Sequence, residues 1–322
     1  MAVYTEVPTE ALGAFLMEYD LGGLLACLPI AEGVENTNYR LSTTGGEWIL
    51  TLFERRVAEV ELPWFLGLME HLAAHGIVCP KPVRGRDGVT LRRLCGRAAA
   101  VTTFLPGTWP RQVEPAHCGG VGQALARLHL AAAGFAPQRR NALGPEGWPP
   151  LLARSAAHPA SGTLPPGLLA ELERALVTIL DAWPKTPLPR GHIHADLFPD
   201  NVFFHEGRVS GLIDFYFAAT DLLAYDVAVC LNAWCFNSDA AFIPADASSL
   251  LEAYRSVRPL ETAERAALPV LCAGAALRFT LTRLYDWLAT PADALVVRKD
   301  PMEYVARLRC FLSQGERLLD GL

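Results

Sequence analysis

The chain has 322 residues, of which 51% are hydrophobic and 19% are charged, and this composition is typical of a well-packed globular protein with room for two lobes. Its net charge of −6 at pH 7 argues against a nucleic-acid-binding surface, which needs clustered Lys and Arg. The first twenty residues carry four acidic and no basic side chains, unlike a signal peptide, and the apolar run 266–277 is shorter than a membrane span. We therefore expect a cytoplasmic protein that binds neither nucleic acid nor membrane.

The eight cysteines show no CxxC pair and no Cys/His cluster with zinc spacing. They stand at positions 27, 79, 95, 118, 230, 235, 272 and 310. We expect buried, reduced thiols.

The N-terminal part of the chain predicts one helix and then three strands. Thr9 is expected to cap a short helix that runs to Tyr19 and ends at a pair of glycines. Gly45-Gly46 is expected to form a two-residue hairpin turn, and the small polar connection 32–38 either binds phosphates through backbone N–H groups or is an ordinary loop. The predicted strands cover residues 24–30, 38–43 and 47–53.

Another helix and a buried strand complete this first part. An amphipathic pattern predicts a helix over residues 58–75, closed by Gly76. The nearly uncharged run 98–104 predicts a buried strand, which Leu105-Pro106-Gly107 breaks. We place a hinge and a domain boundary at this break.

Beyond the hinge the pattern is mainly helical. Residues 136–166 are rich in Pro, Gly and Ala and predict a long irregular loop. Strands first and helices later indicate an α+β arrangement of two lobes. The predicted helices include residues 121–128, 168–180, 221–236, 248–257, 261–289 and 301–319.

The stretch from His194 to Asn201 has the spacing H-x-D-x-x-x-x-N, which matches the catalytic loop of protein kinases. In that chemistry a triphosphate needs carboxylate and amide oxygens that hold Mg²⁺, and a separate carboxylate that accepts the proton of the incoming hydroxyl. Asn201 and Asp214 suit the metal, and Asp196 suits the proton.

The residues between these ligands predict a hairpin. Residues 199–200 favour a turn, residues 202–204 a strand, residues 206–207 a second turn, and residues 209–213 a strand that delivers Asp214 at its end. Any Asp-rich turn followed by strands shares part of this pattern. The functional interpretation therefore depends on the motif and the hairpin together.

Four motifs occur in order over most of the chain. They are Leu125-Ala126-Arg127-Leu128-His129, His194 to Asn201, Ile213-Asp214-Phe215 and Tyr225-Asp226-Val227-Ala228. On these motifs the chain resembles the aminoglycoside-phosphotransferase and choline-kinase superfamily. The resemblance implies a bilobal, protein-kinase-like α+β fold with an N-terminal antiparallel-sheet lobe and a mainly helical C-terminal lobe. Further stretches resemble the branch of this superfamily whose members phosphorylate L-homoserine, namely residues 35–39, 50–54, 211–221 and 277–288.

The resemblance implies a kinase that uses ATP and Mg²⁺ to phosphorylate the side-chain hydroxyl of L-homoserine, a step toward threonine. Residues 1–105 would bind the nucleotide, and residues 106–322 would carry the catalytic loop and the acceptor site. Asp196 would be the base, and Asn201 and Asp214 the metal ligands. The implied nucleotide-binding residues are Asn36, Thr37, Asn38, Thr51, Thr103, Phe104 and Leu105.

One departure from the kinase pattern concerns the phosphate-binding lysine. The strand that usually carries it reads Ile49-Leu50-Thr51-Leu52, and the homoserine branch also has Thr there. Arg55, Arg56 or Lys81 could supply the charge, or Mg²⁺ could suffice, and the sequence does not choose among them.

An amino-acid acceptor needs a cation for its carboxylate and an anion for its ammonium group. Arg278, Arg283 and Asp286 share one predicted helix, on which Arg283 and Asp286 are neighbours because they are three positions apart. An Arg facing the acceptor could bind its carboxylate through two parallel hydrogen bonds, and the alternative is an ion pair within the helix that binds no substrate. Further acceptor candidates are Tyr216, Asn232 and Trp234.

Three other polar residues have predicted structural roles. Asp226 lies in an apolar helix pattern, so it needs partners if it is buried, and the resemblance implies that it bonds the backbone of the catalytic loop. His129 is expected to be a core histidine, and His194 to orient the catalytic loop through the backbone.

Two other functions stay open on the sequence. A kinase for choline, an aminoglycoside or another small alcohol would share the catalytic motif, although a cationic acceptor favours a more acidic pocket than the mixed Arg and Asp of the C-terminal region. A non-catalytic nucleotide-binding regulator would explain the missing lysine, but not the intact Asp196, Asn201 and Asp214.

Overall fold

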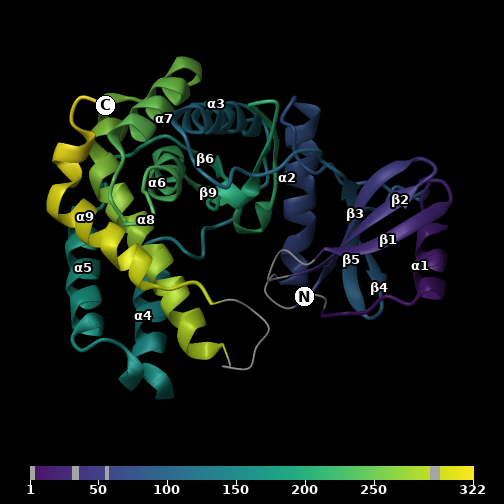
Figure 1. Ribbon diagram of the computed structural model, residues 1–322, viewed down its shortest axis with the longest axis horizontal. Coiled ribbons are helices and arrows are strands. Elements are labelled where there is room, and N and C mark those ends of the chain that lie inside the picture. Colours follow the sequence, from purple (N-terminus) through teal and green to yellow (C-terminus); the bar gives the residue numbers. More distant parts are fainter. Residues whose placement is uncertain (1–3, 31–35, 55–57, 291–297) are drawn as a thin grey trace. The chain divides into compact units, whose positions relative to one another are not determined.

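The computed structural model describes residues 4–30, 36–54, 58–290 and 298–322 (Figure 1). The chain forms two compact units: unit 1 comprises Met1–Gly107 and Ser210–Tyr216, and unit 2 comprises Thr108–Val209 and Phe217–Leu322. The single boundary predicted after residue 105 did not include the return of residues 210–216 to unit 1.

A five-stranded antiparallel sheet forms the centre of unit 1, with the strand order β1-β2-β3-β5-β4 (Figure 1). Its strands are β1 (Leu24–Ile30), β2 (Thr37–Thr43), β3 (Gly46–Phe53), β4 (Arg92–Leu94) and β5 (Arg97–Thr103). The predicted strands are confirmed to within one residue at each end, and β4 is an addition. The predicted Gly45-Gly46 turn is wrong by one position, because Thr43 pairs with Gly46 and the two turn residues are Thr44 and Gly45.

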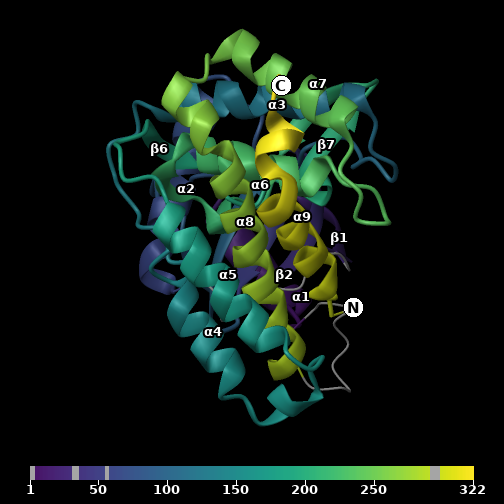
Figure 2. The ribbon, with the colours of Figure 1, turned by 90° about the vertical axis from the view of Figure 1, so that its left-hand side faces the viewer.

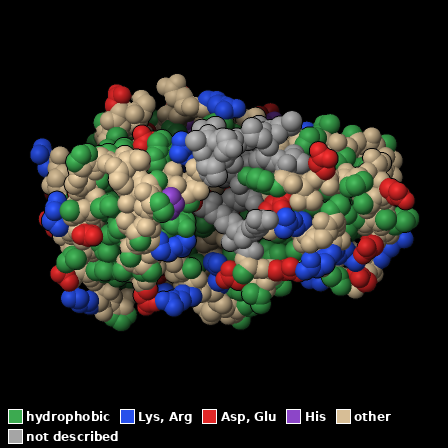
Figure 3. Space-filling view, turned by 90° about the horizontal axis from the view of Figure 1, so that it is seen from below, with side chains coloured by type: hydrophobic (Ala, Val, Ile, Leu, Met, Phe, Trp, Pro, Cys, Tyr) green, Lys and Arg blue, Asp and Glu red, His purple; other side chains and the backbone are tan. Residues whose placement is uncertain are grey.

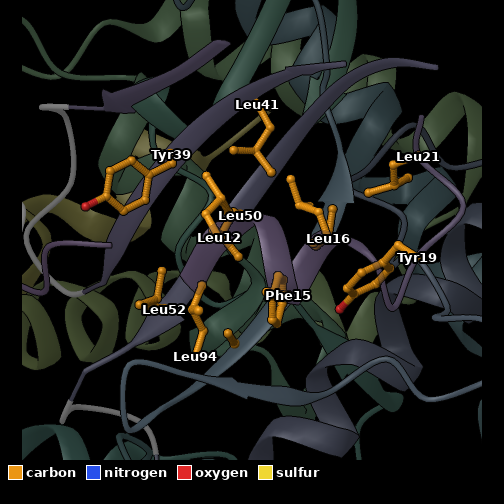
Figure 4. Packing of buried hydrophobic residues seen from close by; sticks show 12 residues of the cluster. Leu12, Phe15, Leu16, Tyr19, Leu21, Tyr39, Leu41, Leu50, Leu52 and Leu94 are labelled. Atoms are coloured by element: carbon orange, nitrogen blue, oxygen red, sulfur yellow. The ribbon is translucent and has the colours of Figure 1, made fainter. Parts of the chain in front are cut away.

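Helix α1 (Thr9–Leu16) covers one face of this sheet. Its buried Leu12 and Phe15 belong to the same hydrophobic cluster as Leu50 and Leu52 of β3 (Figure 4). Each such buried side chain contributes roughly 1.5–3 kcal/mol to the stability of the unit. The predicted cap is wrong: Pro8 occupies the N-cap position and Thr9 is the first helical residue, and the helix ends before Tyr19.

A 3-10 turn (Glu59–Glu61) leads into α2 (Leu62–Ala74). The helix therefore begins four residues later than predicted, while Gly76 follows its end with φ +84°, a conformation that favours glycine. The apolar face predicted for this helix is buried in the structure, and its residues are Leu62, Phe65, Leu66, Met69 and Leu72.

Strand β8 (Arg208–Leu212) carries the chain back into unit 1. There Ser210 Oγ donates a hydrogen bond to Pro106 O at 2.9 Å, and Leu212 N donates to Val78 O at 2.9 Å. Gly211 permits the close approach, because a Cβ atom at this position would lie 2.7 Å from Leu105 Cδ1. The returning segment places Asp214 in unit 1.

Unit 2 is mainly helical, and its longest helix, α8, contacts α4, α5, α6 and α9 (Figure 2). Its helices are α3 (Pro115–Ala132), α4 (Trp148–Ala156), α5 (Leu168–Ala182), α6 (Leu223–Trp234), α7 (Pro244–Val257), α8 (Thr262–Ala289) and α9 (Met302–Leu319). The irregular loop predicted for residues 136–166 is confirmed only for residues 136–147, because the rest of the stretch contains α4 and a 3-10 helix at Pro159–Thr163. The prolines of α4 lie in its first turn, where a missing N–H costs nothing.

Two short pairs of strands lie near the predicted catalytic loop in the sequence. Strand β6 (Arg190–Ile193) pairs antiparallel with β9 (Ala219–Leu222), and neither was predicted. Asp221 consequently belongs to a strand, and α6 begins two residues later than expected. Strand β7 (Val202–His205) pairs with β8 through Glu206 and Gly207, whose φ angles of +50° and +75° confirm the predicted two-residue turn.

Gly122 allows α3 to pack closely on α7. A Cβ atom at this position would lie 2.1 Å from the backbone oxygen of Leu250. We expect Gly122→Ala to lower the free energy of unfolding by about 1–3 kcal/mol, because the backbone must move to relieve the overlap. Chemical unfolding followed by circular dichroism measures the change. Gly13→Ala is the control, since no atom lies within 4 Å of the added Cβ; an unchanged midpoint in Gly122→Ala would contradict the packing argument.

Among the described helices, α8 is the one long and apolar enough to cross a membrane, and 83% of its most apolar window is buried inside the protein. A core helix of a soluble protein meets the same criterion, so the length and composition of α8 are weak evidence for a span.

All eight cysteines are free. Five of them are buried, as expected: Cys79, Cys118, Cys230, Cys235 and Cys272. Cys27 and Cys310 are partly buried, and Cys95 is exposed. The expectation of buried thiols therefore holds for most of them and not for Cys95.

Charged side chains of both signs alternate on the face shown in Figure 3. In unit 1, Arg84 pairs with Glu70 at 2.6 Å and Arg93 pairs with Glu59 at 2.7 Å, and all four side chains are substantially exposed. Exposed pairs of this kind contribute about 0–1 kcal/mol each, so the stability of the unit depends on its apolar core.

Candidate active site

The catalytic loop, His194 to Asn201, begins directly after β6 and ends in a 3-10 turn (Pro199–Asn201) before β7. Ala195 has a φ angle of +62°, a left-handed conformation that is unfavourable for residues other than glycine. The backbone of the loop therefore needs specific partners to hold this conformation.

Asp226 of α6 supplies two of these partners. Its Oδ2 accepts a hydrogen bond from His194 N at 2.7 Å, and its Oδ1 accepts one from Ala195 N at 2.8 Å. Burial alone would raise the pKa of Asp226, but the hydrogen bond and charge of His129 and the N–H of His194 hold this pKa below its usual value. The role that the resemblance implied for Asp226 is confirmed.

His129 of α3 connects this carboxylate to α7. Its Nε2 lies 3.1 Å from Asp226 Oδ2, and its Nδ1 lies 2.7 Å from the hydroxyl of Tyr254. Arg258 in turn donates to the Tyr254 hydroxyl and pairs with Glu264 at the start of α8. His129 is thus a core histidine, as predicted, and the network beyond it gave no sequence signal because its members are far apart in the chain.

Asp196 lies at the centre of the loop with its side chain 18% exposed. Burial raises the pKa of this carboxyl, and the nearby Arg278 opposes the rise. Asn201 Nδ2 donates to Asp196 O at 2.8 Å and lies 3.4 Å from Asp196 Oδ2. The motif thus brings the predicted base and one predicted metal ligand together.

Asn201 and Asp214 have the donor atoms that Mg²⁺ prefers. The contacts of Asn201 engage its NH₂ group, which leaves the amide oxygen as an available metal ligand. Asp214 follows β8 with a φ angle of +63° and contributes a carboxylate. Mg²⁺ binds one or two such oxygens together with substrate phosphates, and the described residues contain no cluster of three or more His, Cys, Asp or Glu side chains that could hold a metal by themselves. Asn201, in unit 2, and Asp214, in unit 1, thus each offer an oxygen atom of the kind that Mg²⁺ takes together with substrate phosphates.

The predicted nucleotide-binding residues lie in unit 1 and fall into two groups. Asn38 Oδ1 accepts a hydrogen bond from Thr51 Oγ1 at 2.8 Å, and this pair lies on the sheet face that α1 does not cover. Asn36 and Thr37 instead bond Glu54, and Thr37 also accepts from the backbone of the N-terminal segment. Asn38 is partly exposed and can meet a ligand, whereas Thr51 is buried beneath it with its hydroxyl bonded to Asn38. The side chains of Asn36 and Thr37 are already engaged.

Thr103 is the last residue of β5, and Phe104 and Leu105 follow it. Thr103 forms backbone and side-chain hydrogen bonds with the backbone of Lys81. The guanidinium of Arg40 lies 4.5 Å from the ring centroid of Phe104, and Arg40 shares the sheet face of Asn38 because the two residues are two positions apart in β2. Sequence reasoning overlooked Arg40, although the alternation of the strand could have revealed it. Of the three cations considered for the missing lysine, Lys81 is exposed, and Arg55 and Arg56 lie outside the described residues.

Tyr216 also lies in unit 1, where its ring packs edge to face against Phe53 and Phe65 at centroid distances of 5.3 and 5.7 Å. Burial raises its pKa, as does the charge of Asp214. Tyr216 is thus a neighbour of Asp214 and of the hydroxyl of Thr51. This position associates it with the nucleotide-binding residues of unit 1.

Two of the acceptor candidates in unit 2 are corrected by their burial. Asn232 is fully buried, and its Nδ2 donates to Ala228 O and Cys272 O at 2.9 and 3.0 Å. Trp234 is 1% exposed, and its Nε1 donates to Leu197 O at 2.7 Å. Both side chains support the protein interior, so they are unsuited to contact a substrate.

The charged residues of α8 separate in the structure. Arg278 is buried and contacts the catalytic loop, whereas Arg283 pairs with Glu303 of α9 at 2.6 Å. Arg283 also lies 4.3 Å from the ring centroid of Tyr304, and burial together with Glu303 and Asp196 raises the pKa of Tyr304 to about 12 against the lowering effect of Arg307 and Arg283. Glu303 was missed, because a partner on another helix has no sequence spacing that identifies it. Asp286 lies one turn beyond Arg283 on α8 and is half-buried.

A buried Asp that fixes the loop from His194 to Asn201, with the predicted base and one predicted metal ligand within that loop, is the arrangement expected of a kinase-like phosphotransferase. A profile described as the phosphotransferase enzyme family (APH) matches residues 26–260. The chain belongs to this family.

Two relatives match this chain over nearly its whole length. The homoserine kinase of Granulibacter bethesdensis is 66% identical over 315 residues, covering 97% of this chain and 97% of the relative. The homoserine kinase of Acidiphilium cryptum is 62% identical over 315 residues and covers 98% of both chains.

Solved structures show the fold. The amicoumacin kinase hAmiN in complex with AMP-PNP, Ca²⁺ and Ami has a TM-score of 0.70 at 17% identity, over 97% of this chain and 92% of that one. Choline kinase from Cryptosporidium parvum Iowa II has a TM-score of 0.68 at 13% identity, over 97% of both chains. The predicted α+β, protein-kinase-like fold, with an N-terminal antiparallel sheet and a mainly helical remainder, is thereby confirmed.

Proposed function

We propose that this protein is an ATP-dependent kinase that phosphorylates the side-chain hydroxyl of L-homoserine, a cytoplasmic step toward threonine. The observation that carries the proposal is the similarity over nearly the whole chain to homoserine kinases at 55–66% identity. The arrangement of Asp196, Asn201 and Asp226 in the loop supports phosphoryl transfer independently of those names.

In this function the residues of unit 1 bind the nucleotide and those of unit 2 carry the base and the acceptor site. Asn38, Thr51 and the backbone of residues 103–105 are the proposed nucleotide contacts. Asn201 and Asp214 would hold Mg²⁺, which when bound offsets the negative charge of the transferred phosphate. Asp196 accepts the proton of the acceptor hydroxyl late in the transfer, so catalysis depends mainly on positioning and charge.

For the acceptor we propose the Arg283–Glu303 pair, with Asp286 nearby on the same helix. The pair offers a cation for the α-carboxylate and an anion for the ammonium group, and it lies against Tyr304, whose pKa is sensitive to the charge of Asp196. Glu303 is partly exposed, and the cations Arg283, Arg307 and Lys299 overcome its burial and hold its pKa below the usual value. An anionic Glu303 and a cationic Arg283 match a zwitterion better than a cationic acceptor such as choline.

Arg283→Met should raise the KM for homoserine by about 10-fold or more and leave the KM for ATP unchanged, since a charge-assisted hydrogen bond contributes about 1.5–3 kcal/mol. The preference for homoserine over 3-amino-1-propanol, which lacks the carboxylate, should fall by a similar factor. Steady-state kinetics with both acceptors measure the KM values and this preference. Arg309→Met is the matched control, because Arg309 pairs with Glu171 on the protein surface. An unchanged preference in Arg283→Met would exclude Arg283 as the carboxylate ligand.

The direct test of the proposed function is ADP release with Mg-ATP in the presence of homoserine, serine, choline or an aminoglycoside. We expect turnover with homoserine well above that with the other three. Activity with choline and not with homoserine would overturn the substrate assignment. Nucleotide binding without turnover of any acceptor would instead favour a non-catalytic regulator.

A further inference from the structure

Ala195, directly before the proposed base, is held through both of its backbone polar groups. Asp226 Oδ1 accepts a hydrogen bond from its N–H at 2.8 Å, and the guanidinium Nη1 of Arg278 donates a short hydrogen bond to its carbonyl oxygen. Because Ala195 has a left-handed φ angle of +62°, the two charged partners hold the peptide groups on either side of an unfavourable conformation. These two contacts therefore determine the backbone position from which the Asp196 side chain extends.

Arg278 reaches this point from α8 and is itself rigidly held. Its side chain is 3% exposed, and its guanidinium lies 4.0 Å from the ring centroid of Phe279 and 5.3 Å from that of Phe217. A buried guanidinium is costly unless it is paired. Within the described part of the chain, Asp196 is its acidic ion-pair partner, with Nη2 3.8 Å from Oδ1.

The site of Arg278 suits a loop anchor better than an acceptor ligand. Its Nη1 donates a hydrogen bond to Ala195 O, and its Nη2 faces Asp196. Its Nε is buried and has no hydrogen-bond acceptor among the described residues. A substrate carboxylate bound through two parallel hydrogen bonds would have to reach both Nε and Nη2, and Nε is buried from solvent. The edge with Nη2 is the one that faces the base.

We propose that Arg278 is a positioning residue that fixes the Ala195 peptide and directs the Asp196 carboxylate toward the acceptor hydroxyl. The inference rests on the proposed function, in that Asp196 acts as the base of a kinase. It also reassigns Arg278, which the sequence had offered as a ligand for the acceptor carboxylate. Arg278 acts on turnover through Asp196 and makes no contact with the amino-acid head of the acceptor.

The experiment compares Arg278→Ala and Arg278→Lys with wild type in steady-state kinetics, with and without millimolar guanidinium chloride against an equal concentration of NaCl. Arg278→Ala should lower kcat by on the order of 100-fold, the lower range of what a general base contributes, with less than about a threefold change in the KM for homoserine. Guanidinium should raise the kcat of Arg278→Ala by at least about 10-fold, because it can occupy the space that the arginine side chain leaves. Arg278→Lys should be intermediate, because one ammonium group cannot reach both contacts in the same geometry.

Arg265→Ala is the control for an arginine on the same helix, since Arg265 is exposed; it should match wild type with and without guanidinium. A raised KM for homoserine with unchanged kcat in either Arg278 variant would overturn the inference and make Arg278 an acceptor ligand. Lost kcat without guanidinium rescue, in an Arg278→Ala protein whose circular dichroism is native, would also overturn it. If Arg278→Ala does not fold, the changes in kcat and in the KM for homoserine are measured in Arg278→Lys and interpreted in the same way.

The outcome for Arg278 is separable from the outcome for the proposed function. Whichever alcohol of the acceptor panel the wild type phosphorylates serves as the acceptor in this comparison. Failure of wild type with homoserine refutes the substrate, whereas the pattern of kcat, KM and rescue in the variants decides the role of Arg278.

Discussion

Asp196→Asn is expected to lower kcat by about 10²–10⁴-fold while the affinity for ATP stays within a factor of about two. The amide has nearly the shape of the carboxylate but cannot accept the proton of the acceptor hydroxyl. The backbone oxygen that bonds Asn201 is unchanged, so the loop keeps its conformation. ADP release measures kcat, and calorimetric titration measures ATP binding.

Asp200→Asn provides the matched comparison for this variant. Asp200 lies in the same loop, its side chain is 51% exposed, and it pairs with Lys299 at 3.8 Å. We expect it to retain turnover within a few-fold of wild type. Near-normal turnover in Asp196→Asn would rule out Asp196 as the base.

The second large effect is expected for Asp226→Asn, which should lower the free energy of unfolding by about 3–5 kcal/mol and abolish most turnover. An amide has one oxygen, so it can accept from His194 N or Ala195 N but presents an N–H group to the other. The left-handed Ala195 then loses one of its two anchors. Thermal unfolding followed by circular dichroism measures the loss of stability.

Asp226 also makes this stability depend on pH. Its pKa is lower in the folded protein than in the unfolded chain, so the carboxylate stabilises the fold above about pH 4, and that contribution is lost as the pH falls through the folded value. Asp226→Asn should lack this acid-range loss. Asp181→Asn, on the exposed surface of α5, is the control and should stay within about 0.5 kcal/mol of wild type. Equal stability of wild type and Asp226→Asn at pH 7 would refute the anchoring role.

Periodicity predicted those elements whose burial is one-sided. Strand β2 alternates cleanly and the buried face of α2 repeats at helical spacing, because one side of each packs on the core and the other does not. Strands β1 and β3 show no such alternation of burial, and their apolar, β-branched composition predicted them instead. Helix α4 was missed because its first turn is Trp148-Pro149-Pro150, which resembles a loop, although Pro is tolerated at that end. Strands β6 and β9 have four residues each, which is too short for a pattern.

The residues of the candidate site also differ in how well the sequence predicted them. The sequence predicted Asp196, Asn201 and Asp214 as site residues because their spacing is local to one loop and one hairpin. The sequence could give the chemical type of Asn232 and Trp234 but not the direction of their side chains, and both point into the core. Arg278 and Arg283 looked equivalent on one helix, and only the fold separates a buried anchor from a residue paired with Glu303.

The buried thiols provide an intrinsic reporter of local unfolding in unit 2. Burial raises the pKa of Cys230 and Cys235 well above its usual value, so neither thiol reacts until its surroundings open to solvent. Cys230 Sγ lies 4.0 Å from Leu197 O, within the catalytic loop, whereas Cys95 is exposed throughout. The rate at which a thiol reagent modifies Cys230, relative to Cys95, therefore reports how often the catalytic loop detaches from α6. The measurement uses the native sequence and needs no introduced label.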